Sequence, residues 1–409
     1  MRTYYFSENP YPKAWDADPI SIRVTLPNKH FDPVDGSDLI NRYIDEWVLC
    51  DELGIDIWVN EHRSTATCLT ASTVPPLSIL ARQTKNARLL TLGATIGTRW
   101  DPVLTAEELS YVDVVSGGRL EMGLVKGYST EIAPSNVNPV TLTERFWEAH
   151  DLILKAMTTH DGPFNWEGEH FHFRQVNIWP RPYQQPLPPV WITAFSPHSV
   201  PPVAERGHIV AGGINIGVGR EIFRTYRRVR AELGYPAPGL DRFAYMALVG
   251  VGDTEEEGHR FASQVKGYLE TTSKTIAPFL APPGFVPVAN KVKILKNNLK
   301  GGATAGLQTD REGRPISYAT ADVPALISAG AVFAGTPDQV FEQIKDLYEY
   351  VGGFKHLLAM MHGGALSHAD TTKSTTLFAK EVLPRLKELG TPDNEDLEEF
   401  ERIRQTAAA

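Results

Sequence analysis

The chain has 409 residues, of which 42% are hydrophobic and 22% charged, a composition typical of globular proteins. Its formal net charge is -9 without a long basic run, which argues against nucleic acid or an anionic membrane surface as the main partner. Two cysteines exclude a disulfide framework, and the sequence shows neither a signal peptide nor a membrane-spanning run, so we expect a soluble cytoplasmic protein.

Short apolar runs recur along the chain and predict buried strands. Few of these runs alternate apolar with polar residues, which favours parallel strands that are covered on both faces. The predicted strands cover residues 3–6, 55–60, 88–96, 119–125, 189–194, 209–213, 244–251 and 355–361.

Segments with helical spacing separate these strands. Gly54 is a C-cap candidate for the first helix, and Thr105 with Glu108 predicts a capping box at the start of the second. The alternation of strand and helix, repeated about eight times, favours an α/β fold of the (β/α)8 TIM barrel type over a doubly wound sheet. The predicted helices cover residues 39–54, 105–118, 141–157, 198–207, 218–234, 254–270 and 336–353.

Two stretches interrupt the alternation. Residues 161–188 predict a β-hairpin followed by a proline-rich link, and residues 271–334 form a long, lid-like insertion. Loops of that length in compact domains are usually functional or disordered. We therefore expect one barrel domain over 1–390, insertion included, and an acidic helical tail over 391–409 that either docks on a neighbour or stays free.

Polar residues gather just after the predicted strands, where a barrel carries its chemistry. Lys126 supplies a charge and Gly127 permits close approach of a ligand, while "FSPHS" opens a weak helix with free amides; together they predict a phosphate pocket. A surface lysine and an ordinary N-cap are the alternative, and His62 stays open between a structural and a catalytic role. His170 and His172 lack a third ligand, so no metal site is predicted.

An ordered set of motifs identifies a family. "VNEHR", "SGGRLEMGLVKGY", "TERFWEAHDLILKAM", "GEHFHFRQVNIWPRPYQQPLPPVWITAFSPHS" and "AGTPDQVFEQI" occur in that order. The set resembles the bacterial luciferase-like flavin-dependent monooxygenases. The resemblance implies a (β/α)8 barrel that binds reduced FMN at its C-terminal face, uses O2 as co-substrate and receives the reduced flavin from a separate NAD(P)H-dependent flavin reductase.

The resemblance also implies roles for individual residues. His62, preceded by Glu61, would help to form or hold a flavin C4a-(hydro)peroxide. Gly93 and Ala94 match the position of a non-proline cis peptide under the flavin ring. The implied cofactor-binding residues are Gly93, Ala94, Thr95, Lys126, Gly127, Tyr128, Phe195, Ser196 and Ser199.

The expected substrate is a small, apolar organic molecule, with Arg63 and His362 as candidate contacts. Arg63 stands where many relatives have a second histidine; it either holds an anionic substrate group or, as the interpretation we favour, pairs with a carboxylate. A dimer or tetramer is expected by the same resemblance. Three alternatives stay open: a deazaflavin-dependent oxidoreductase that transfers hydride, a metal-dependent barrel hydrolase using His62, Glu61 and His362, and a catalytically silent flavin-binding protein.

Overall fold

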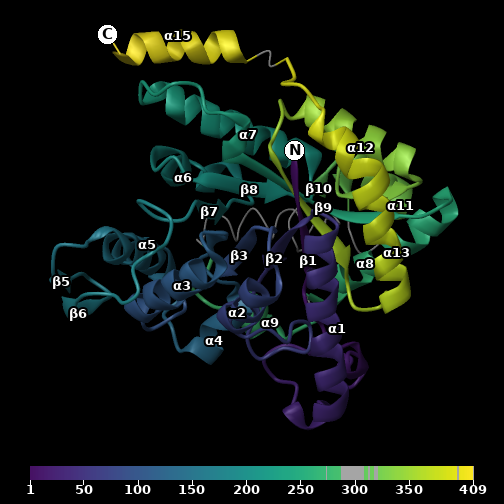
Figure 1. The fold of residues 1–409 in the computed structure, drawn as a ribbon, viewed down its shortest axis with the longest axis horizontal. Coiled ribbons are helices and arrows are strands. Elements are labelled where there is room, and N and C mark those ends of the chain that lie inside the picture. The colour runs from purple at the N-terminus through teal and green to yellow at the C-terminus, as the bar shows by residue number, and fades with distance from the viewer. Residues whose placement is uncertain (273, 287–307, 312–313, 317–320, 394–395, 409) are drawn as a thin grey trace.

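The computed structural model describes residues 1–272, 274–286, 308–311, 314–316, 321–393 and 396–408. Eight parallel strands pair in the order β1–β2–β3–β4–β7–β8–β9–β13, and pairing of β13 with β1 closes the ring (Figure 1). The closed ring confirms the predicted (β/α)8 TIM barrel and rules out the doubly wound sheet. The barrel strands are β1 (Arg2–Ser7), β2 (Asp56–Val59), β3 (Leu89–Ala94), β4 (Leu120–Leu124), β7 (Val190–Thr193), β8 (Ile209–Gly213), β9 (Phe243–Val251) and β13 (His356–His362).

Alternation of side chains along each strand produces two apolar layers. One cluster contains Tyr4, Phe6 and Trp58 and fills the barrel interior, where the rings of Phe6 and Trp58 stack at 3.8 Å between centroids. The other cluster contains the neighbouring Tyr5 and Ile57 and packs against the surrounding helices. Phe6 and Trp58 stand near the C-terminal ends of their strands, so they give the mouth of the barrel an apolar floor.

Two helices, α1 and α3, begin earlier than the sequence pattern predicted. Asp32 caps α1 by accepting from the amides of Val34 and Asp35, and Asp101 caps α3, so these helices start at Pro33 and Pro102. The predicted Thr105–Glu108 capping box is therefore wrong, because an aspartate followed by proline is a stronger start. The helices around the barrel are α1 (Pro33–Glu52), α2 (Val74–Gln83), α3 (Pro102–Ser116), α4 (Ser129–Ser135), α5 (Leu142–Thr158), α6 (Pro201–Glu205), α7 (Ile216–Glu232), α8 (Glu255–Thr272), α12 (Pro337–Tyr350), α13 (His368–Leu377) and α14 (Leu383–Lys387). Within the described ranges, none of them combines the length and apolar character that crossing a bilayer requires.

The two predicted interruptions are present, with one boundary changed. β5 (Phe164–Glu167) and β6 (His172–Val176) form the expected antiparallel hairpin. The 271–334 stretch holds α9 (Ala277–Leu280), β10 (Gln308–Thr309), β11 (Pro315–Ile316), α11 (Val323–Ser328) and most of β12 (Val332–Gly335). β12 pairs in parallel with the end of β9, so the last residues of this stretch belong to the main sheet. Residues 287–307 of the predicted insertion lie outside the described residues.

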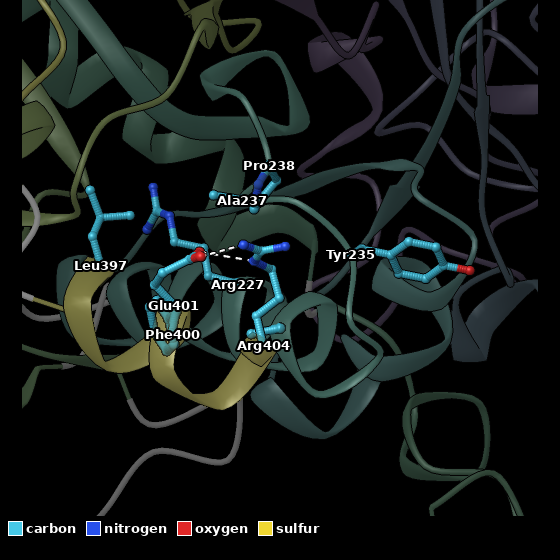
Figure 2. Close-up of a pocket in the computed structure, with 9 residues that line it drawn as sticks. Arg227, Tyr235, Ala237, Pro238, Leu397, Phe400, Glu401 and Arg404 are labelled. Atoms are coloured by element: carbon cyan, nitrogen blue, oxygen red, sulfur yellow. Dashed lines mark hydrogen bonds and ion pairs between the residues drawn. The ribbon is translucent and has the colours of Figure 1, made fainter. Parts of the chain in front are cut away.

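The C-terminal helix α15 (Leu397–Ala408) packs on α7 of the same chain (Figure 1). Asp396 forms an ion pair of 2.8 Å with Arg224, and the ring of Phe400 is buried. A small cleft between the two helices is lined by Arg227, Tyr235 and Arg404 among others (Figure 2). Of the two arrangements expected for the tail, the structure shows docking, on a helix of its own barrel.

Candidate active site

Three strand ends bring charged groups to His62. His62 follows β2, and its Nδ1 lies 2.6 Å from Oε1 of Glu131, in the first turn of α4 after β4. Its Nε2 lies 3.6 Å from Oε2 of Glu8, which follows β1. Burial lowers the pKa of His62, but the carboxylates of Glu8 and Glu131 outweigh it and raise that pKa above its ordinary value. The arrangement favours the protonated form of the His62 imidazole.

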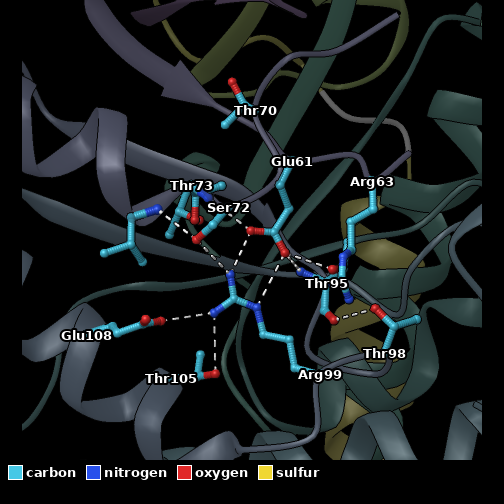
Figure 3. A network of polar contacts seen from close by, with 12 residues as sticks. Glu61, Arg63, Thr70, Ser72, Thr73, Thr95, Thr98, Arg99, Thr105 and Glu108 are labelled. Carbon is cyan, nitrogen blue, oxygen red and sulfur yellow. Dashed lines mark hydrogen bonds and ion pairs between the residues drawn. The ribbon is translucent and has the colours of Figure 1, made fainter. Parts of the chain in front are cut away.

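Glu61 lies beside His62 in the chain but is fully occupied by hydrogen-bond donors. Its carboxylate accepts from the Thr73 amide at 2.9 Å, the Thr95 amide at 2.9 Å and the Thr95 hydroxyl at 2.7 Å. The Arg99 guanidinium closes the group at 2.7 Å and continues to Glu108 at 3.2 Å (Figure 3). A buried carboxylate with all its lone pairs engaged holds neighbouring loops in place. The geometry therefore favours a positioning role for Glu61.

The third strand ends in a closely packed turn. The structure has a non-proline cis peptide between Leu92 and Gly93, one residue before the Gly93–Ala94 bond that the resemblance indicated. A Cβ at Gly93 would lie 2.1 Å from a methyl group of Val125, so only glycine fits there. Ala94 is buried, and Thr95 is fixed by its two hydrogen bonds to Glu61. These residues form a rigid wall of the barrel mouth.

The fourth strand ends with a half-buried cation and a glycine. Lys126 forms no ion pair within the described part of the chain, and burial lowers its pKa from the ordinary value. Its Nζ lies 5.2 Å from the ring centroid of Phe285. Gly127 has φ +102° and a Cβ there would meet Thr98 at 2.8 Å, so this position requires glycine. The ring of Tyr128 is partly exposed and faces the Arg23 guanidinium at 5.5 Å.

The fifth strand end does not provide the expected row of free amides. Phe195 is exposed beyond β7, and Ser196 precedes a single 3-10 turn, Pro197–Ser199. The Ser199 amide and hydroxyl both donate to the Ser196 carbonyl, at 3.1 Å and 2.8 Å. Proline nitrogens carry no hydrogen, so the turn has few donors left. The turn therefore offers fewer free amides than a regular helix start, and the phosphate contacts of Ser196 and Ser199 stay a prediction. Pairing of β7 with β4 places both serines near Lys126 in the sheet order.

The structure places the two candidate substrate contacts, Arg63 and His362, in different environments. Arg63 is exposed and its Nη1 donates to the Ser135 hydroxyl at 3.1 Å; among the described residues it pairs with no carboxylate, contrary to the interpretation favoured above. His362 is 0% exposed, with Nδ1 3.2 Å from Glu46 on α1. It therefore faces the helix layer, and we withdraw it as a substrate contact. His62, Glu61 and His362 each have separate partners, which removes the ligand set of the metal-dependent alternative.

Several residues of the site escaped sequence reasoning. Arg23 is 2% exposed and sits on a segment after β1 that has no motif. Its neighbour Ile22 accepts from the Ala66 amide at 3.2 Å and donates to the Lys274 carbonyl at 3.1 Å, so the start of the insertion lies over the β1 and β2 ends. Glu131 carried a signal, because it stands three residues after Tyr128 in a capping-box position. Arg99 carried none.

Comparisons with known proteins agree with this architecture. A sequence model described as luciferase-like monooxygenase matches residues 22–353. The oxygenase component of a flavin-dependent trigonelline monooxygenase from Acinetobacter baylyi is 30% identical over 144 residues, 35% of this chain and 39% of that protein. The oxygenating constituent of 3,6-diketocamphane monooxygenase from Pseudomonas putida, solved in complex with FMN, has a TM-score of 0.70 at 20% identity and covers 96% of this chain and 99% of its own.

The same fold also serves another chemistry. A secondary alcohol dehydrogenase superposes with a TM-score of 0.60 at 13% identity, covering 94% of this chain and 99% of its own. The fold by itself therefore does not separate oxygenation from hydride transfer. The family sequence model spans most of the chain and includes every strand end described above except the first and the last. On that evidence this chain belongs to the luciferase-like monooxygenase family.

Proposed function

We propose that this protein is the oxygenating component of a two-component flavin monooxygenase. It would bind reduced FMN at the C-terminal ends of the barrel strands, use O2, and oxygenate a small, largely apolar organic substrate. A separate NAD(P)H-dependent flavin reductase would supply the reduced flavin. The observation that carries the proposal is the pairing of His62 with two carboxylates next to a half-buried Lys126 that has no ion-pair partner in the described ranges.

The residues at the β3 and β4 ends fit a flavin phosphate and ring system. Lys126 offers a charge without an ion-pair partner in the described ranges, and the adjoining Gly127 allows the strand to end in a turn that only glycine adopts easily. The buried hydroxyls of Ser129 and Thr130, next in the chain, have no hydrogen-bond partner in the described structure. Unsatisfied polar atoms beside a free cation are typical of a site that a polar ligand completes. We therefore assign the phosphate to Lys126 and the ring to the Gly93 side of the mouth.

Bound reduced flavin supplies the electrons that activate O2, and the chain supplies position, a proton and shelter. His62 holds a proton at the β2 end, and Glu61 with Arg99 fixes the loops around it. Phe6 and Trp58 make the floor apolar, and Phe285 of the insertion faces Lys126. The contact of Phe285 with Lys126 supports a cover over the site by the described residues around Phe285, since keeping water out protects a reactive intermediate.

Arg63 is proposed as the residue that selects among substrates. Its guanidinium is exposed near the β2 end and bonds only to the Ser135 hydroxyl in the described structure, so it stays available to an anionic group. The substrate would then combine an apolar body, placed over the Phe6 and Trp58 floor, with one acidic substituent. Loss of binding for the acidic member of a substrate pair in Arg63→Met, with the neutral member unaffected, would support this.

An exposed apolar face on α3 supports the expected homo-oligomer. Leu104, Tyr111, Val114 and Val115 are exposed and recur on one side of this helix. Contiguous apolar residues on a surface helix commonly mark an interface, and closed symmetry lets a single face serve both copies. Sedimentation of the wild type and of Tyr111→Glu would distinguish a dimer or tetramer from a monomer.

The test of the function is an anaerobic titration with FMN, reduced FMN and a deazaflavin cofactor, followed by admission of O2. Preferential binding of reduced FMN and a slowly decaying oxygenated flavin absorbance would support the proposal. Binding of the deazaflavin without reaction toward O2 would favour hydride transfer instead. Coupled turnover that is unchanged in His62→Ala, or a wild type without any turnover, would support the catalytically silent flavin-binding alternative. If the protein binds no flavin, the cofactor assignment is overturned.

A further inference from the structure

The His62 imidazole is held on both sides by carboxylates from other strand ends. Glu131 Oε1 lies 2.6 Å from Nδ1, and Glu8 Oε2 lies 3.6 Å from Nε2. Both carboxylates are buried, whereas the His62 side chain retains 21% exposure. A buried carboxylate is costly without a cationic or hydrogen-bonding partner, so each of these groups depends on the others.

Helix capping engages only one of the two carboxylate oxygens of Glu131. Its Oε2 accepts from the Tyr128 amide at 2.6 Å and completes the capping box of α4. One oxygen is sufficient for that purpose, and glutamine performs it as well as glutamate. The other oxygen, Oε1, is directed at His62, and here a negative charge differs from an amide. The negative charge of Glu131 therefore has a purpose beyond starting the helix.

The contacts determine which nitrogen carries which proton. An ionised carboxylate only accepts, so the hydrogen between Glu131 and His62 belongs to Nδ1. Nε2 is left as the atom able to give or take a proton, because Glu8 Oε2 lies beyond hydrogen-bond distance and already accepts from Asn60 at 2.6 Å. Burial and Arg23 lower the pKa of His62, but the charges of Glu8 and Glu131 outweigh them and raise it.

We propose that Glu131 is a positioning residue for the reaction, holding the Nδ1–H of His62 so that Nε2 carries the transferable proton, which Glu8 stabilises by its charge. This inference rests on the proposed function. In the step, the Nε2–H bond breaks as an O–H bond forms on a reacting oxygen atom, leaving a neutral imidazole whose Nδ1–H still donates to Glu131. Nε2 then regains a proton from water.

The experiment follows the ring nitrogens of His62 by two-bond 1H–15N NMR in labelled protein without cofactor, across pH 5 to 9. His62→Ala assigns the signals. In wild type we expect a midpoint above that of an unperturbed histidine and, on the basic side, the Nδ1–H tautomer. Glu131→Gln, which keeps the cap, should move the midpoint to lower pH and mix the tautomers. Glu8→Gln should lower the midpoint and keep the Nδ1–H tautomer.

Glu107→Gln is the matched control, because this substitution on α3 removes the same charge from a residue that does not contact His62. The titration of His62 should be unchanged in this variant. An unaltered midpoint and tautomer in Glu131→Gln would overturn the proposal. If Glu131→Gln does not fold, Glu8→Gln decides, since an unchanged midpoint there contradicts the shared role of the carboxylates. His62→Ala should lower coupled turnover by about 10²–10⁴-fold and Glu131→Gln by a smaller factor.

The NMR readout separates two kinds of failure. If the titration behaves as expected but the protein binds no reduced FMN, the positioning of His62 stands and the proposed reaction is wrong. If reduced FMN binds and turns over while His62 titrates independently of Glu131, the function stands and this inference is wrong.

Discussion

Replacing Arg99 tests whether Glu61 is a positioning group. The Arg99 guanidinium forms an ion pair of 2.7 Å with the buried Glu61 carboxylate, and a second ion pair of 3.2 Å with Glu108. Arg99→Met keeps an unbranched apolar stem but removes the guanidinium, which leaves Glu61 with three neutral donors, from Thr73 and Thr95. Removing one partner of a buried pair costs about 3–5 kcal/mol, because the remaining charge stays buried. Glu108 is partly exposed, so losing Arg99 costs little on that side.

Glu61→Gln gives the complementary measurement. An amide retains one acceptor oxygen, so we expect a smaller loss of about 1–3 kcal/mol. The double variant should lose less than the sum of the single variants, because both changes remove the same pair. The free energy of unfolding, from urea titrations at pH 7, measures all three. Arg63→Met is the matched control: Arg63 is exposed and bonds only to Ser135, so its replacement should stay within about 0.5 kcal/mol.

Two results would refute this reasoning. A free energy of unfolding for Arg99→Met within about 1 kcal/mol of wild type would mean that the Arg99–Glu61 ion pair contributes little to the stability of the fold, because a broken buried pair costs more than that. A Glu61→Gln variant that keeps its stability and its affinity for reduced FMN, yet loses turnover together with one limb of the pH profile, would show that Glu61 itself moves a proton.

Three further outcomes are expected. Burial raises the pKa of Glu46, but His362, Arg42 and His368 outweigh it and lower that pKa to about 2. Because the pKa in the folded state lies below that in the unfolded state, the ionised carboxylate stabilises the fold above pH ~4.5, and about 3 kcal/mol of this stabilisation is lost as the pH falls toward 2. The difference in unfolding free energy between wild type and Glu46→Gln, from urea titrations, should therefore shrink below pH ~4.5; a difference that stays constant would contradict this cause. Lys126→Met should weaken binding of reduced FMN by about 10- to 100-fold while leaving reduced riboflavin, which lacks the phosphate, unaffected; equal losses would place the phosphate elsewhere. Phe400→Ala should release α15, raising hydrogen exchange over residues 397–408 while the barrel melts as before, and a lowered barrel melting temperature would instead make this helix part of the core.

The sequence by itself determined the architecture of this protein. The order of apolar runs and amphipathic segments favoured the barrel, because strand burial and helix periodicity are local properties of the chain, and the family motifs implied the same fold. It also located the polar residues of the site, since those at the C-terminal ends of parallel strands must share one face. The local patterns misplaced the start of α3, because the Asp101 cap is a stronger helix-start signal than the predicted capping box. They also missed β12, because its four residues form a strand only by pairing with the end of β9.

Only the tertiary structure decided what each polar residue contacts. His62 and Glu61 are adjacent in sequence, yet Nε2 of His62 accepts no hydrogen bond in the described structure, whereas Glu61 is enclosed by donors from Thr73 and from the loop after β3. His362 also lies at the C-terminal end of a barrel strand, as the last residue of β13, but it contacts Glu46 on α1. Side-chain direction at a strand end depends on the parity of the final residue and on which helix packs behind it. That information comes from elements distant in the chain. Arg23 and Arg99 therefore emerged only from the fold, and the capping-box position of Glu131 did not indicate that it contacts His62.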